Sequence, residues 1–181
     1  MAWANDDMVL YHGCTDQSLH PNDPNGIVVS GGPHNINPQA GAARPDFGPG
    51  FYTTSWLHQA KNWANVRAAK LRIRHPNVKA TVLSMRVSRN RFAELEALVF
   101  ASDHDNYYPF IAYCRQGLVP HAAPHLRGRP YDVVAGPVSI GMQSMVIAQA
   151  DQISFHTTKA VEALVGLSVF ATGSPNLEVS P

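Results

Sequence analysis

Aromatic side chains that could hold a flat ring are concentrated in residues 46–64. This stretch begins with a glycine-rich loop at 47–50, passes into the β-like run Phe51–Thr54, and continues as a helix carrying Trp56 and Trp63. A loop, an aromatic strand and an aromatic helix side by side would form a wall for a planar ligand. The same pattern is also typical of core packing, so the residues alone indicate either a ring-binding wall or a packed core.

Three further groups of residues are candidates for chemistry. His12 and Gly13 follow a short apolar strand, where a histidine serves either packing or ligand binding. Five cations within 67–79 favour either a solvated helix end or a phosphate-binding face. His121 and His125 have the spacing of zinc ligands on a helix, but two prolines interrupt the segment and no carboxylate is nearby. We therefore expect no metal.

The composition describes an ordinary globular protein. The chain has 181 residues, 45% of them hydrophobic and 15% charged, which is enough to bury a core within one domain. Fourteen basic and thirteen acidic side chains leave a net charge of +1, so the overall charge attracts nucleic acid or anionic membranes only weakly. The sequence has no secretory signal or transmembrane span, and Cys14 and Cys114 are expected as free thiols. These features predict a cytoplasmic protein without a membrane partner.

Short strands and helices are expected to position the candidate residues. Strands are predicted over 8–11, 51–54, 79–87, 131–138, 143–150 and 152–155, with a strand-like segment over 26–29 and a turn at Ala150–Asp151. Helices are predicted over 55–73, with Ser55 as the N-cap, and over 91–101, 106–118 and 159–165. This order favours a single α+β domain over 1–168 and a C-terminal tail over 169–181.

Three separated motifs resemble the ADP-ribosyltransferase fold, on the diphtheria-toxin and poly(ADP-ribose) polymerase side, and more closely the bacterial DUF3990 family. They are LYHG at 10–13, DFGPGFYTT with the QAKNWA helix at 46–64, and DQISFHT at 151–157. The segment YDVVAGPV also resembles a strand of that family, and the likeness covers nearly the whole chain. It implies split antiparallel β-sheets with inserted helices.

In that fold a histidine, a tyrosine and a glutamate surround NAD, which is the co-substrate. The resemblance implies that His12 bonds a ribose hydroxyl, that the backbone of Gly13 clamps the nicotinamide amide, and that Tyr52 is the triad tyrosine. Phe51 is the hydrophobic residue of the same motif.

Further NAD contacts are implied on the helix and the loop. Trp63, preceded by Asn62, matches an aromatic residue that stacks on the other side of the nicotinamide. Arg44, just before the glycine-rich loop, is a candidate for binding the pyrophosphate, or else a surface arginine.

The third triad position departs from the glutamate of the fold. Alignment of QISFHT places Gln152 there, together with His12 and Tyr52 as catalytic residues, whereas a slip of one residue would point Asp151 into the site. A glutamine accepts a hydroxyl hydrogen bond but carries no charge and cannot act as a base.

The resemblance implies an NAD-dependent mono-ADP-ribosyltransferase of toxin or effector type. Such an enzyme releases nicotinamide through an oxocarbenium-like transition state and transfers ADP-ribose to a macromolecule. The net charge of +1 favours a protein over a nucleic acid as acceptor, and the resemblance implies a cognate antitoxin or immunity protein. Two alternatives stay open: an NAD glycohydrolase that uses the same site, and a catalytically inactive NAD-binding or interaction module. An effector would also reach a target cell by a route that needs no signal sequence.

Overall fold

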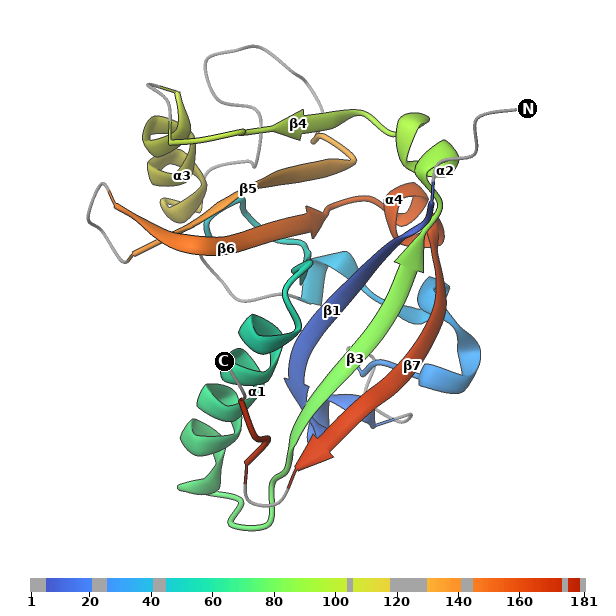
Figure 1. Cartoon of the computed structure of the whole chain (residues 1–181), viewed down its shortest axis with the longest axis vertical. Coiled ribbons are helices and arrows are strands. Elements are labelled where there is room, and N and C mark those ends of the chain that lie inside the picture. Colours follow the sequence, from blue (N-terminus) through green and yellow to red (C-terminus); the bar gives the residue numbers. More distant parts are fainter. Residues whose placement is uncertain are drawn as a thin grey trace.

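Two β-sheets and four α-helices make up the described part of the chain (Figure 1). The computed structural model describes residues 6–20, 26–40, 45–103, 106–117, 130–140, 145–173 and 176–179. The α+β class and the division into two sheets, both predicted from the sequence, are confirmed.

The elements follow one another along the chain with short 3-10 helices between the first two strands. The strands are β1 (Met8–Thr15), β2 (Phe51–Thr53), β3 (Ala80–Val87), β4 (Ala97–Val99), β5 (Val133–Ser139), β6 (Val146–Phe155) and β7 (Leu164–Gly173). The α-helices are α1 (Leu57–Arg72), α2 (Arg89–Ala93), α3 (Tyr107–Arg115) and α4 (Thr158–Glu162). The 3-10 helices are η1 (Asp16–Leu19), η2 (Val29–Gly31), η3 (Pro33–Asn35) and η4 (Pro38–Ala40).

The first sheet has the strand order β1-β3-β7, with β3 at its centre. Apolar side chains fill most of β3 and are buried, as suits a strand covered on both faces. Both neighbours pair with β3 in antiparallel fashion. The second sheet has the order β2-β6-β5-β4, and its β4–β5 pair is parallel, unlike the antiparallel pairing expected throughout.

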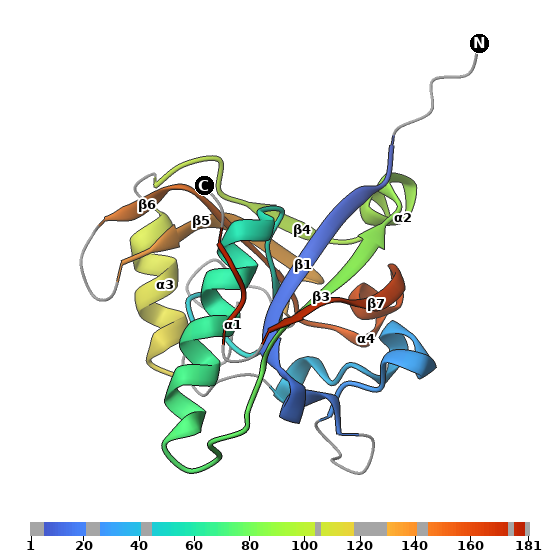
Figure 2. The ribbon, with the colours of Figure 1, turned by 60° about the horizontal axis from the view of Figure 1, so that its bottom comes forward.

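The two sheets pack against each other through the main hydrophobic core, to which Leu10 and Leu83 of the first sheet and Phe51 and Phe155 of the second contribute. Helix α1 lies on the other side of the first sheet (Figure 2), and its buried alanines Ala60, Ala64 and Ala68 form the contact. Helix α3 packs on the other side of the second sheet, against Phe47 and other aromatic residues. Strands β1 and β2, which carry the candidate site, both contribute side chains to the core between the sheets.

Three predictions in the first half of the chain differ from the structure. Strand β1 extends to Thr15, so His12 and Gly13 lie within the strand and not at its end. Residues 26–28 form no strand and lead into η2, which begins at Val29. Helix α1 begins at Leu57 with Trp56 as its N-cap, because Ser55 is bonded elsewhere.

The helix predicted over 91–101 is wrong in its second half. Helix α2 ends at Ala93, and the chain then forms β4, which pairs with β5. Leu95, Leu98 and Val99 fit helical spacing in the sequence, but pairing with β5 determines the observed structure. The helix predicted over 106–118 is confirmed as α3 within the described residues.

The two strands predicted on either side of a turn at Ala150–Asp151 form one strand, β6. Ser139 pairs with Val146 and Pro137 pairs with Asp151, so β6 carries extra residues between these two pairs. Gln149 has a φ of 56° in this bulge. A bulge therefore takes the place of the predicted turn and keeps the strand continuous.

The predicted last helix and tail are also corrected. Helix α4 ends at Glu162, and residues 164–173 form β7, so part of the segment expected as a tail from 169 is a strand paired with β3. Residues 176–179 lie beside α1 (Figure 2), where Asn65 exchanges two hydrogen bonds with the backbone of Leu177, at 2.9 and 2.8 Å. None of the described helices combines the length and apolar character needed to cross a membrane.

Candidate functional site

The two sheets meet where β1 and β2 are bridged by a single residue pair. Tyr11 and Thr54 exchange two backbone hydrogen bonds, of 2.8 and 2.9 Å. Beyond this bridge the imidazole of His12 lies against β2: Nδ1 is 2.6 Å from the carbonyl oxygen of Tyr52, and the ring stacks at 4.6 Å on Phe51. A carbonyl oxygen only accepts, so Nδ1 carries the proton and Nε2 keeps its lone pair.

The imidazole of His12 is neutral at physiological pH. Burial lowers its pKa to about 4, the hydrogen bond to Tyr52 opposes that change, and the positive charge of Arg67 adds to it. Within the described residues no hydrogen bond reaches Nε2. His12 therefore offers a hydrogen-bond acceptor, suited to a hydroxyl group of a ligand.

Gly13 allows α1 to lie directly against β1. A Cβ atom at this position would be 2.3 Å from the carbonyl oxygen of Ala60 and 2.9 Å from the amide nitrogen of Ala64. Backbone groups alternate along a strand, and those of Tyr11 face β2. The N–H and C=O of Gly13, two residues further on, therefore point to the same edge, where β2 makes no backbone hydrogen bond to them.

Tyr52 lies on the opposite face of β2 from His12, contrary to the expectation that both surround one ligand. Its register partner on β6 is Ser154, and its ring stacks on Phe47 at 6.4 Å. The phenol oxygen accepts from the backbone N–H of Phe47 and donates to the carbonyl of Gly48, both at 2.8 Å. The phenol of Tyr52 therefore holds the glycine-rich loop in place through these two hydrogen bonds.

Gln152 shares that opposite face and belongs to a partly buried polar network of Asp46, Arg115, Ser139 and Gln152. Its side-chain amide donates to the Asp46 carboxylate and to the carbonyl of Pro137, both at 2.9 Å, and the residue is 8% exposed. Asp46 also forms an ion pair with Arg115 at 2.5 Å and accepts from the hydroxyl of Ser139 at 2.7 Å. The structure thus does not bring Gln152 together with His12.

Asp151 lies on the other face of β6, at the start of α1. Its carboxylate accepts from the Thr54 hydroxyl at 2.5 Å and from the backbone N–H and hydroxyl of Ser55, at 2.9 and 2.5 Å. The side-chain amide of Gln59 donates a hydrogen bond to the backbone carbonyl of Asp151 at 2.7 Å and accepts one from its backbone N–H at 3.2 Å. Because Thr54 is also the bridge partner of β1, Asp151 is tied to the junction where His12 lies.

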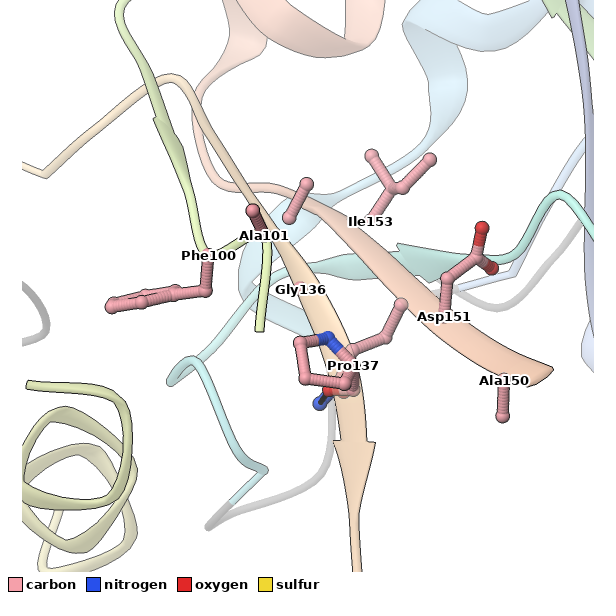
Figure 3. Close-up of a pocket in the computed structure, with 9 residues that line it drawn as sticks. Phe100, Ala101, Gly136, Pro137, Ala150, Asp151 and Ile153 are labelled. Carbon is pink, nitrogen blue, oxygen red and sulfur yellow. Dashed lines mark hydrogen bonds between the residues drawn. The ribbon is translucent and has the colours of Figure 1, made fainter. Parts of the chain in front are cut away.

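A shallow depression of about 300 Å³ lies beside Asp151. Figure 3 shows Ile153 and Asp151 projecting from the same side of β6 into this region. The lining is mostly apolar and consists of Phe100, Ala101, Ala135, Gly136, Pro137, Ala150, Asp151, Gln152 and Ile153. The depression places apolar surface next to the carboxylate.

Trp63 lies on α1 with 59% of its surface exposed, and Asn62 beside it is exposed as well. Phe51 is buried against His12, so it is available as support for the imidazole and not as an open platform. The aromatic stretch at 46–64 is therefore divided: Tyr52 packs in the core, and Trp63 faces outward.

Some sequence candidates lie outside the described residues, namely Arg44, His121 and His125. Among the residues that the structure does describe, no group of three or more His, Cys, Asp or Glu is arranged to hold a metal ion.

The sequence alone gave little indication that Asp151 and Arg67 bear on the surroundings of His12. Asp151 shares a face with Ile153 and Phe155, and the alternation of these two apolar side chains would have placed it on the inner face of β6. Arg67 acts on His12 through space, and only its position within the basic run at 67–79 pointed to it.

Comparison with known proteins gave one match. A family model described as "Protein of unknown function (DUF3990)" matches residues 34–141. No curated protein and no solved structure matched the chain.

Proposed function

The chain belongs to the DUF3990 family, and from that premise we propose that it binds NAD and transfers its ADP-ribose part to a macromolecule. The family description assigns no function, so support comes from the motifs and from the junction of the two sheets. The observation that carries the proposal is the edge of β1, where a neutral His12 lies next to Gly13, whose backbone N–H and C=O make no backbone hydrogen bond to β2.

His12 and Gly13 supply the contacts that a nicotinamide riboside needs. Nε2 of His12 accepts a hydrogen bond from a ribose hydroxyl, and its protonation state does not change near neutral pH. Gly13 offers one N–H and one C=O on the same side, which match the carbonyl and amino groups of a carboxamide. Trp63 on the adjacent helix adds exposed ring surface.

Asp151, and not Gln152, takes the role of the acidic residue in this proposal. A carboxylate has about four lone-pair positions, and the hydrogen bonds from Thr54 and Ser55 leave one of them for a ribose hydroxyl. Its negative charge stabilises the positive charge that develops on the ribose when the bond to nicotinamide breaks. The bonding electrons leave with nicotinamide, and the acceptor forms the new bond and loses its proton.

Binding of NAD without turnover is a second candidate, favoured by one observation. The Asp151 carboxylate already accepts three hydrogen bonds at the start of α1, which is also what a purely structural contact between β6 and α1 would need. In that case the site would recognise NAD and leave it intact.

Incubation of the purified protein with adenylate-labelled NAD and a cell lysate tests the proposal. We expect nicotinamide release together with a labelled macromolecule, and treatment with protease or nuclease identifies the acceptor class. Free ADP-ribose without labelled macromolecule would mean an NAD glycohydrolase. NAD that binds but is not consumed would establish the second candidate, and absence of NAD binding would refute both.

Substitution of the carboxylate tests the assigned role. Asp151→Asn keeps the size of the side chain and is expected to lower the rate of nicotinamide release by about a hundredfold. Asp103→Asn is the matched control, because Asp103 is exposed and its carboxylate accepts a hydrogen bond from Tyr108 of α3 and not from a residue of the junction. Equal rates for the two variants would remove Asp151 from the chemistry.

A further inference from the structure

The basic residues in 67–79 do not act as one cluster. The Arg72 side chain is held by the carbonyl of Val78 at 3.1 Å and by the side chain of Asn176 at 2.9 Å. Arg67, in contrast, is exposed and forms no ion pair or hydrogen bond through its side chain within the described residues. Arg67 is thus a cation with its donors available to a ligand.

Arg67 lies where α1 passes the edge of β1. It follows Trp63 by four residues, so both side chains lie on one side of the helix. It is also one turn beyond Ala64, whose amide nitrogen would be 2.9 Å from a Cβ atom on Gly13. Helix α1 therefore carries Arg67 just past Gly13.

The electrostatic effects of Arg67 agree with this position on the helix. Its positive charge contributes to the low pKa of His12 and opposes the rise in the pKa of Cys14. These two residues flank Gly13 on β1, so the charge of Arg67 acts on the part of the strand that contains Gly13.

We propose that Arg67 binds the pyrophosphate of NAD, or of a related nucleoside diphosphate, at the edge of β1. This inference rests on the proposed function and adds the group that holds the phosphates. An arginine presents a planar fork of N–H donors that matches two phosphate oxygens. The exposed ring of Trp63, four residues earlier on the same side of α1, covers the adjoining part of the ligand.

The groups assigned to the ligand follow one another along α1. Asp151 bonds residues at the start of the helix, Gly13 lies opposite Ala60 and Ala64, and Arg67 follows about one turn, or about 5 Å, further on. Because the ribose joins the nicotinamide to the pyrophosphate in NAD, the ligand would bend at this ribose, so that the carboxamide meets Gly13 and the pyrophosphate meets Arg67.

Calorimetric titration with three ligands tests the inference. ADP-ribose contains the pyrophosphate, whereas nicotinamide riboside and adenosine contain no phosphate. Arg67→Gln is expected to weaken binding of ADP-ribose by about tenfold to thirtyfold and to leave binding of nicotinamide riboside unchanged. Arg67→Lys, which keeps the charge but not the fork, is expected to recover part of the loss.

Arg74→Gln is the matched control, because it removes the same charge from an exposed position beyond the C-terminal end of α1. It is expected to bind ADP-ribose as the unmodified protein does. If Arg67→Gln binds ADP-ribose with unchanged affinity, or weakens the phosphate-free ligands equally, the inference is overturned while the proposed function stands. If the unmodified protein binds neither NAD nor ADP-ribose, the proposed function fails as well.

Discussion

Mild acid should destabilise the folded protein through His12. In the unfolded chain this histidine takes up a proton around pH 6.5, whereas in the folded protein its pKa is about 4. Between these values the unfolded state binds a proton that the folded state does not bind, so unfolding becomes more favourable as the pH falls. The contribution of neutral His12 to the unfolding free energy is fully present above about pH 6.5 and is lost progressively as the pH falls to about 4.

The size of this effect follows from the two pKa values. Each pKa unit corresponds to about 1.4 kcal/mol, so the full difference between pKa 6.5 and about 4 is worth about 3.5 kcal/mol. Between about pH 7.5 and about pH 5 the expected loss of unfolding free energy is about 2 kcal/mol, because the folded protein is still mostly unprotonated at His12. Most carboxylates remain charged over this interval, which keeps their contribution small.

Urea denaturation at both pH values measures this loss, with His12→Asn as the reference. The asparagine amide can still donate to the carbonyl of Tyr52 but does not titrate. The variant will be less stable at both pH values because it loses the ring contact with Phe51. Between the two pH values the variant is expected to lose about 2 kcal/mol less unfolding free energy than the unmodified protein. An equal pH dependence of protein and variant would refute the assigned environment of His12.

Three further results are expected. Gly13→Ala should lower the unfolding free energy by about 3 kcal/mol in urea denaturation, because the added methyl group meets the backbone of Ala60 at 2.3 Å; a change below about 0.5 kcal/mol would contradict this close approach. Gln152→Glu should lower the unfolding free energy by about 3 kcal/mol at about pH 8, because it replaces a donor 2.9 Å from the Asp46 carboxylate with a second carboxylate. This loss of unfolding free energy should become smaller near pH 5, where one carboxylate can take up a proton. An unchanged unfolding free energy at about pH 8 would contradict the partly buried polar network. Burial raises the pKa of Cys14 to about 12, so its thiol should resist disulfide reagents at pH 8 until the protein is unfolded, as a colorimetric thiol assay would show.

The regular elements were predictable where local pattern and tertiary packing agree. Helices α1 and α3 are examples, because each buries one set of side chains with the helical period, and β3 is another, because its mostly apolar side chains are buried on both faces. The segment 97–99 was not, since Leu98 and Val99 suit a helix or a strand equally and only parallel pairing with β5 distinguishes the two. The bulge in β6 was read as a turn because extra residues in one strand leave no distinct sequence signal.

The positions of the candidate residues depend on which face each strand presents. His12, Gly13 and Trp63 lie along the edge of β1 and the adjoining helix. Tyr52 and Gln152 share the face of the second sheet that is turned away from His12. A single motif does not reveal which face a strand presents, and in β6 one residue separates Asp151 from Gln152.

The strand order of the first sheet affects how a newly made chain can fold. The central strand β3 receives one neighbour from residues 8–15 and the other only from residues 164–173. During synthesis β3 can therefore pair with β1 early, while its second edge stays open until β7 leaves the ribosome. An open apolar strand edge favours association between nascent chains. The last strand thus protects the protein against aggregation as much as it completes the sheet.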